Sequence, residues 1–95
     1  MKDVFPEAKP RQYRRIDVYE HTGEQVLRYV CFELLSSGTY AVQSADYLRA
    51  DQTDGQVLEL EKQVVSLFQD MAPDDRLPAC STIKEAIEQF KARFE

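Results

Sequence analysis

The sequence predicts an α+β domain in which a three-stranded antiparallel β-meander is followed by two C-terminal α-helices. Strand-like segments between Arg14 and Arg49 are separated by two tight-turn signals, Thr22-Gly23 and Ser37-Gly38. Helical periodicity begins only after a turn-forming cluster over residues 51–55. Strands first and helices second is the order typical of this fold class.

Length and charge set the domain organisation. A chain of 95 residues, 43% of them hydrophobic, suits one domain with one core. Residues 1–15 contain five basic and two acidic residues, a net charge of +3, whereas the whole chain carries −5. We expect residues 1–11, with prolines at positions 6 and 10, to form a flexible basic arm and residues 12–95 to form an acidic domain.

The turn signals set the expected strand register. If each signal supplies the two central residues of a hairpin loop, Val18 lies opposite Leu27 and Leu35 lies opposite Tyr40. Because side chains alternate between faces, these residues share one mainly apolar face, which we expect to be the core. A three-residue loop beginning at His21 would instead shift the first strand by one position and mix the faces. The core face also receives four polar residues: Arg14, Glu33, Ser44 and Asp46.

Two C-terminal segments have the 3.6-residue periodicity of amphipathic helices. The first carries one apolar stripe and ends at Pro73: Val57, Leu60, Val64, Leu67, Phe68 and Met71. The second begins with a predicted capping box between Thr82 and Glu85. Its stripe comprises Ile83, Ala86, Ile87, Phe90 and Phe94. Since each helix is apolar on one side only, we expect both helices to pack on one face of the sheet, the core face.

The opposite face of the sheet carries the functional prediction. In the expected register Asp17 lies opposite Arg28, and Arg28 lies opposite Tyr47, in an otherwise apolar patch. An exposed apolar patch with a polar rim is typical of a protein–protein interface. The alternative is that one helix covers each face, or that the N-terminal arm folds over the patch. The predicted partner-binding residues are Tyr13, Arg15, Tyr19, Arg28, Val30, Phe32, Leu34 and Tyr47.

Motifs for catalysis or metal binding do not emerge from the sequence. His21 is the only histidine and falls in a turn, without a second imidazole to complete a site. Asp54-Gly55 and Glu61 have the spacing of a calcium loop, but Ala50 and Gln52 occupy positions that need oxygen donors. We therefore expect no enzyme activity, no cofactor and no metal.

The two cysteines and the absence of long apolar runs favour a cytoplasmic protein. No run approaches the roughly 20 residues that cross a bilayer, and the N-terminus lacks the apolar region of a signal peptide. Cys31 and Cys80 are expected to be reduced thiols, with a disulfide between them as the alternative.

The sequence thus predicts a small, acidic, non-catalytic protein–protein interaction module. It either self-associates or binds a larger partner, as an inhibitor or immunity-type protein does. Nucleic acid is not the expected partner, because an acidic body repels phosphates. One alternative is a nucleic-acid-associated protein that binds through Arg11, Tyr13, Arg14 and Arg15. A second alternative is an enzyme of a type that the sequence does not reveal.

Overall fold

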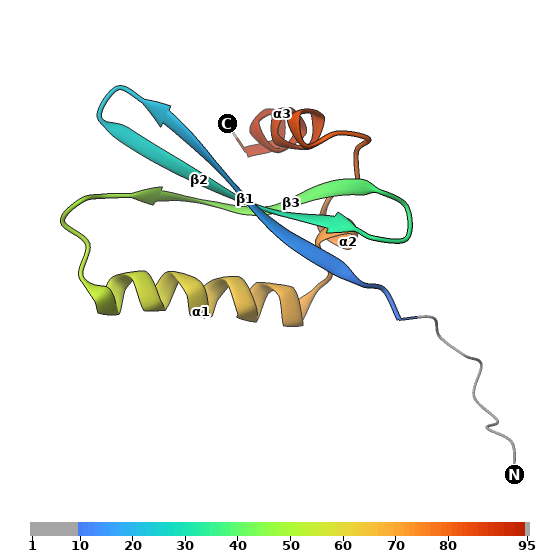
Figure 1. The fold of residues 1–95 in the computed structure, drawn as a ribbon, viewed down its shortest axis with the longest axis horizontal. Coiled ribbons are helices and arrows are strands. Elements are labelled where there is room, and N and C mark those ends of the chain that lie inside the picture. Colours follow the sequence, from blue (N-terminus) through green and yellow to red (C-terminus); the bar gives the residue numbers. More distant parts are fainter. Residues whose placement is uncertain (1–9, 95) are drawn as a thin grey trace, which may run out of the picture.

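The structure is a computed structural model that describes residues 10–94, and its elements follow the predicted order (Figure 1). The α+β class, with a three-stranded antiparallel meander followed by helices, is confirmed. Of the predicted basic arm, residues 1–9 lie outside the described residues. The strands are β1 (Tyr13–Thr22), β2 (Gln25–Leu34) and β3 (Thr39–Leu48), in the sheet order β1-β2-β3. The helices are α1 (Asp54–Asp70), α2 (Pro73–Arg76) and α3 (Ile83–Phe94).

The first hairpin turns at Gly23 and Glu24, one residue later than predicted. Gly23 has a φ of 59°, and no described non-glycine residue, Glu24 included, has a positive φ. A positive φ at the first turn residue alone is the pattern of a type II′ turn, in which glycine comes first. Val18 consequently pairs with Tyr29 instead of Leu27. The partner shifts by two residues, so the side chains of β1 and β2 stay on their predicted faces.

The second hairpin has a longer loop than predicted, Leu35–Gly38. The Leu34 carbonyl accepts the Gly38 amide at 2.8 Å, and Gly38 closes the loop with a φ of 67°. Glu33, rather than Leu35, pairs with Tyr40. Again the shift is even, so the first half of β3 keeps its predicted faces.

A β-bulge at Gln43 reverses the faces of the rest of β3. The register shifts between Val30 and Cys31, which leaves Gln43 as the extra residue. Ser44 and Asp46, which a regular strand would place in the core, therefore leave the core face. The prediction for this half of the strand is wrong.

The two long helices cover opposite faces of the sheet, contrary to the prediction that both pack on one face (Figure 1). On the predicted core face, Ala86 of α3 joins a buried cluster with Tyr29 of β2. On the other face, Val64 of α1 packs with Val30 and Phe32 of the same strand. Successive side chains of β2 thus enter two different cores, and this central strand is buried on both sides.

Both long helices begin at a threonine that satisfies a free amide of the first turn. Thr53 accepts a hydrogen bond from the Gln56 amide at 3.1 Å, and the Gln56 side chain accepts from the Thr53 amide at 2.9 Å. At α3, the Thr82 hydroxyl accepts from the Glu85 amide at 3.1 Å. This contact is one half of the predicted capping box.

Truncation of Phe32 tests the second core. Phe32 is buried against Phe68, with ring centroids 4.9 Å apart, so Phe32→Ala should cost about 3–5 kcal/mol of unfolding free energy in urea denaturation. Phe94→Ala removes the same ring from an exposed position and should cost far less. Similar losses in the two variants would contradict burial of Phe32 beneath α1.

Candidate functional site

Helix α1 covers the face on which the sequence predicts partner binding. Val30 and Phe32 are buried beneath the helix, and the bulge turns Tyr47 to the other face. The predicted apolar patch is therefore not open in the isolated chain. Of the predicted residues, Arg28, Val30 and Phe32 are buried, Tyr13 and Leu34 are half-buried, and Arg15, Tyr19 and Tyr47 are exposed.

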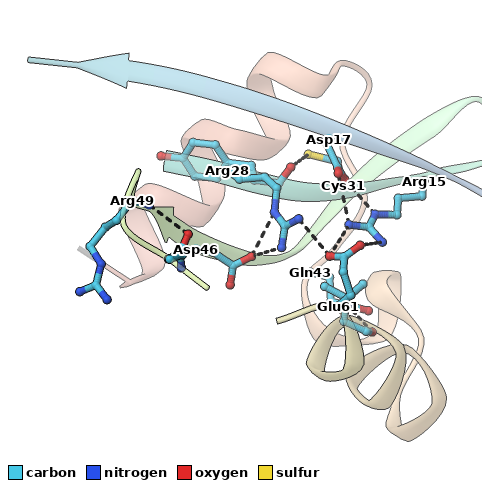
Figure 2. Close-up of polar contacts among 11 residues, drawn as sticks. Arg15, Asp17, Arg28, Cys31, Gln43, Asp46, Arg49 and Glu61 are labelled. Carbon is cyan, nitrogen blue, oxygen red and sulfur yellow. Dashed lines mark hydrogen bonds and ion pairs between the residues drawn. The ribbon is translucent and has the colours of Figure 1, made fainter. Parts of the chain in front are cut away.

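Arg28 connects the sheet to α1 through two carboxylates (Figure 2). Its Nη2 lies 2.6 Å from Asp46 Oδ2, and its Nη1 lies 3.0 Å from Glu61 Oε2. The predicted cross-strand partners, Asp17 and Tyr47, are wrong. The shifted first hairpin sets Tyr19 opposite Arg28 on one side, and on the other side the bulge brings Asp46 opposite it. Burial disfavours the charge of Arg28, which is only 7% exposed, but hydrogen bonds and charges from both carboxylates outweigh it and raise its pKa.

Glu61 joins β1 to the same group of charges (Figure 2). Arg15 Nη1 lies 3.1 Å from Glu61 Oε1, and Arg15 Nε lies 2.9 Å from Asp17 Oδ1. The hydrogen bond from Arg15 is the largest cause of the lowered pKa of Glu61, and Arg28 adds to it. We call these five residues the arginine–carboxylate network: Arg15, Asp17, Arg28, Asp46 and Glu61.

Strand β1 forms an open edge of the sheet. The Leu35 amide donates to the Gln12 carbonyl at 3.0 Å, which continues the β1–β2 ladder at an even-numbered residue of the first strand. Hydrogen-bonded pairs recur at every second residue, so the odd-numbered residues of β1 direct their N–H and C=O groups outward. Within residues 10–94, these outward groups have no backbone partner in another element. They belong to Tyr13, Arg15, Asp17, Tyr19 and His21.

The other edge of the sheet is less accessible. Tyr40 of β3 and Cys80 exchange two backbone hydrogen bonds of 2.8 Å each. The bulge at Gln43 then interrupts the strand. By contrast, β1 pairs with β2 without a bulge along its whole length and contains neither proline nor glycine. A long regular edge without a bulge or proline can pair its outward groups with another strand.

Helix α1 places apolar side chains beside this edge. Leu58 and Val65 lie three residues before and four residues after Glu61, so they share the side of the helix that reaches β1. They are 57% and 54% exposed, and they border a shallow hollow that also includes Glu61, Lys62 and Ser66. We call the outer edge of β1 together with Leu58 and Val65 the β1 edge surface. The two apolar residues lie off the main stripe of α1, and their seven-residue spacing was the signal for them in the sequence.

The arginines considered for nucleic-acid binding all have acidic partners. Arg11 Nη1 lies 3.3 Å from Asp74 Oδ2, and Arg14 Nη2 lies 2.6 Å from Glu33 Oε1. Arg15 belongs to the arginine–carboxylate network. Their charges are thus balanced locally in the described part of the chain.

The two cysteines are both free thiols. Cys31 lies in the core beneath α3, where burial raises the pKa of its thiol to about 12. Cys80 is half-buried and packs against the same cluster. The disulfide alternative is thus not formed in this structure.

Comparison with protein-family models, with curated proteins and with solved structures finds no match to this chain. Between residues 10 and 94, no three side chains of His, Cys, Asp or Glu are grouped so that they could hold a metal ion. None of the described helices has the length and apolarity that crossing a bilayer requires.

Neutralising Glu61 tests how firmly the network holds α1. Glu61→Gln should lower the unfolding free energy at pH 7 by about 1 kcal/mol or less, because the carboxylate is partly exposed. Since the folded-state pKa is lowered, this stabilisation is present above the ordinary carboxyl pKa of about 4.3 and is lost as the pH falls. Urea denaturation at several pH values would measure the difference from wild type.

Glu59→Gln is the matched control, on an exposed position of the same helix. It should stay within about 0.5 kcal/mol of wild type at every pH. A difference between wild type and Glu61→Gln that persists undiminished at pH 3 would contradict an electrostatic origin.

Proposed function

We propose that this chain is a small, non-catalytic protein–protein interaction module that binds its partner through the β1 edge surface. The partner is either a second copy or a different protein that adds a strand to β1. This proposal keeps the predicted class of function and replaces the predicted sheet face, which α1 covers, by the neighbouring edge.

The observation that carries the proposal is the outer edge of β1, which has no backbone partner among residues 10–94. Added strands derive affinity from main-chain hydrogen bonds and specificity from the side chains beside them. Five residues of β1 present outward backbone groups, and alternate charges at Arg15 and Asp17 could select a partner. Leu58 and Val65 add apolar area that a partner would bury.

The observations favour a protein partner over nucleic acid. A nucleic-acid site needs arginines that can neutralise phosphates, whereas Arg11, Arg14 and Arg15 already have carboxylate partners.

We place the protein in the cytoplasm, which the free thiols of Cys31 and Cys80 support.

A proline in β1 tests the use of this edge. Tyr19 has an outward amide, so Tyr19→Pro should leave the β1–β2 hydrogen bonds intact while removing one donor and obstructing an added strand. Tyr19→Ala removes the same exposed ring and keeps the amide. Proline should therefore weaken association about tenfold more than alanine does, the value of roughly one hydrogen bond.

The measurement is size exclusion with light scattering on the purified full chain, repeated after mixing with native lysate. Circular dichroism checks that both variants keep the fold. Equal association of Tyr19→Pro and Tyr19→Ala would contradict strand addition at β1. A wild-type protein that associates with neither itself nor any lysate protein would contradict the proposed function as a whole.

A further inference from the structure

We propose that the partner at the β1 edge surface is a second copy of this chain, paired antiparallel through β1 about a two-fold axis at Ile16. This inference rests on the proposed function and names its partner and register. The product would be one continuous six-stranded sheet, with α1 of both copies on the same face.

Symmetry restricts the possible registers. A two-fold axis perpendicular to the sheet keeps every side chain on its own face, so a residue can lie opposite only a residue of the same face. The axis must therefore lie midway between one residue of β1 and the same residue of the second copy. Each choice of that residue fixes all the pairs across the interface.

An axis at Ile16 sets Arg15 of each copy opposite Asp17 of the other copy. Within one strand, Arg15 already donates to Asp17 at 2.9 and 3.2 Å. The two copies would thus surround the axis with four charges of alternating sign. Opposite charges directly across an antiparallel pair stabilise it, whereas like charges destabilise it.

The neighbouring axes lack this complementarity. An axis at Arg15 or at Asp17 sets two like charges directly opposite each other. An axis at Val18 sets Asp17 opposite Tyr19 and forms no oppositely charged pair. Among these four positions, only Ile16 combines oppositely charged pairs with the absence of a like-charged pair.

The same register gives a partner to an exposed aromatic ring. Tyr19 is 58% exposed in the isolated chain and would lie opposite Tyr13 of the second copy. The ring of Tyr13 contacts Phe68 of α1, with centroids 5.3 Å apart. Tyr19 would therefore extend the core beneath α1 of its partner. On the other face, Ile16 would meet its own copy in a non-hydrogen-bonded pair, where side chains approach most closely.

A second copy also fits the difference between the two edges of the sheet. Pairing of β1 with β3 of another copy would repeat without closing and would produce fibres. The contact between Tyr40 and Cys80, together with the bulge at Gln43, opposes that arrangement. Pairing of β1 with β1 closes after two copies.

The test measures mass and register together on the full chain. Light scattering should give twice the mass of one chain. A spin label on His21→Cys, in a Cys80→Ser background, should report a distance of about 34 Å across the dimer, at about 3.4 Å per residue. An axis one residue away changes that distance by about 7 Å. Cys31 can stay, since it is buried and the pKa of its thiol is about 12.

Two adjacent charge reversals provide a matched comparison. Arg15→Glu sets like charges across the axis and should weaken the dimer at least about tenfold. Arg14→Glu makes the same change on the other face, opposite Val18, and should weaken it by less than about threefold. Circular dichroism identifies a variant that fails to fold, and the spin-label distance does not depend on either reversal.

A dimer with the distance of about 34 Å and the stated order of variants supports the proposal. A wild-type monomer at concentrations up to about 1 mM overturns it, and so does a dimer with a distance near 41, 27 or 20 Å, the values for axes at Arg15, Asp17 and Val18. If the wild type is monomeric yet captures a lysate protein that Tyr19→Pro loses and Tyr19→Ala keeps, the β1 edge binds a different protein. In that case the proposed function stands and the second copy is wrong.

Discussion

The buried guanidinium of Arg28 is the constraint on which the arrangement of the chain depends. A charged group that is 7% exposed is stable only with carboxylates beside it, and the fold supplies Asp46 from β3 and Glu61 from α1. The contact of Asp46 with Arg28 requires the bulge, since a regular β3 would direct Asp46 to the opposite face. The contact of Glu61 with Arg28 requires α1 to lie on the face of the sheet that carries Arg28. Bulge, helix placement and buried charge are thus mutually dependent.

The sequence was sufficient to predict the strands and the two long helices, but not which face of the sheet each helix covers. Turn glycines, helical stripes and a capping threonine predict the three strands and two long helices, and errors in both hairpin loops shift pairs by two, which preserves the faces. An amphipathic stripe indicates that one side of a helix is buried, but it does not indicate which face of the sheet that side packs on. Two signals pointed to the correct answer. The apolar run from Tyr29 to Phe32 is typical of a strand buried on both faces, and Ser44 and Asp46 on a predicted core face indicated a bulge.

Part of the candidate site was predictable for the same reason. Tyr13, Arg15 and Tyr19 belong to both the predicted patch and the β1 edge surface, because face assignments in β1 do not depend on which helix covers them. Leu58 and Val65 were missed, because the sequence alone does not show which side of α1 stays exposed in the folded chain. Glu61 contacts Arg15 of β1 and Phe68 contacts Tyr13, and these contacts define which side of α1 borders the edge. The outer edge of β1 is open because no other described element pairs with it. That outcome depends on where the rest of the chain packs, which no local sequence pattern encodes.

The coverage of both sheet faces and the absence of a described partner at one edge are linked consequences of the topology. A meander of three strands has two edges, and the chain after β3 pairs with the nearer one, where Cys80 bonds to Tyr40. Helices α1 and α3 are used on the two faces, so no described element remains for β1. Natural sheets usually protect such an edge with proline, a bulge or lysine. Here β1 carries Arg15 and Asp17 in alternation instead. In the dimer that we propose, this alternation disfavours unmatched strands and matches a second copy of β1 running in the opposite direction.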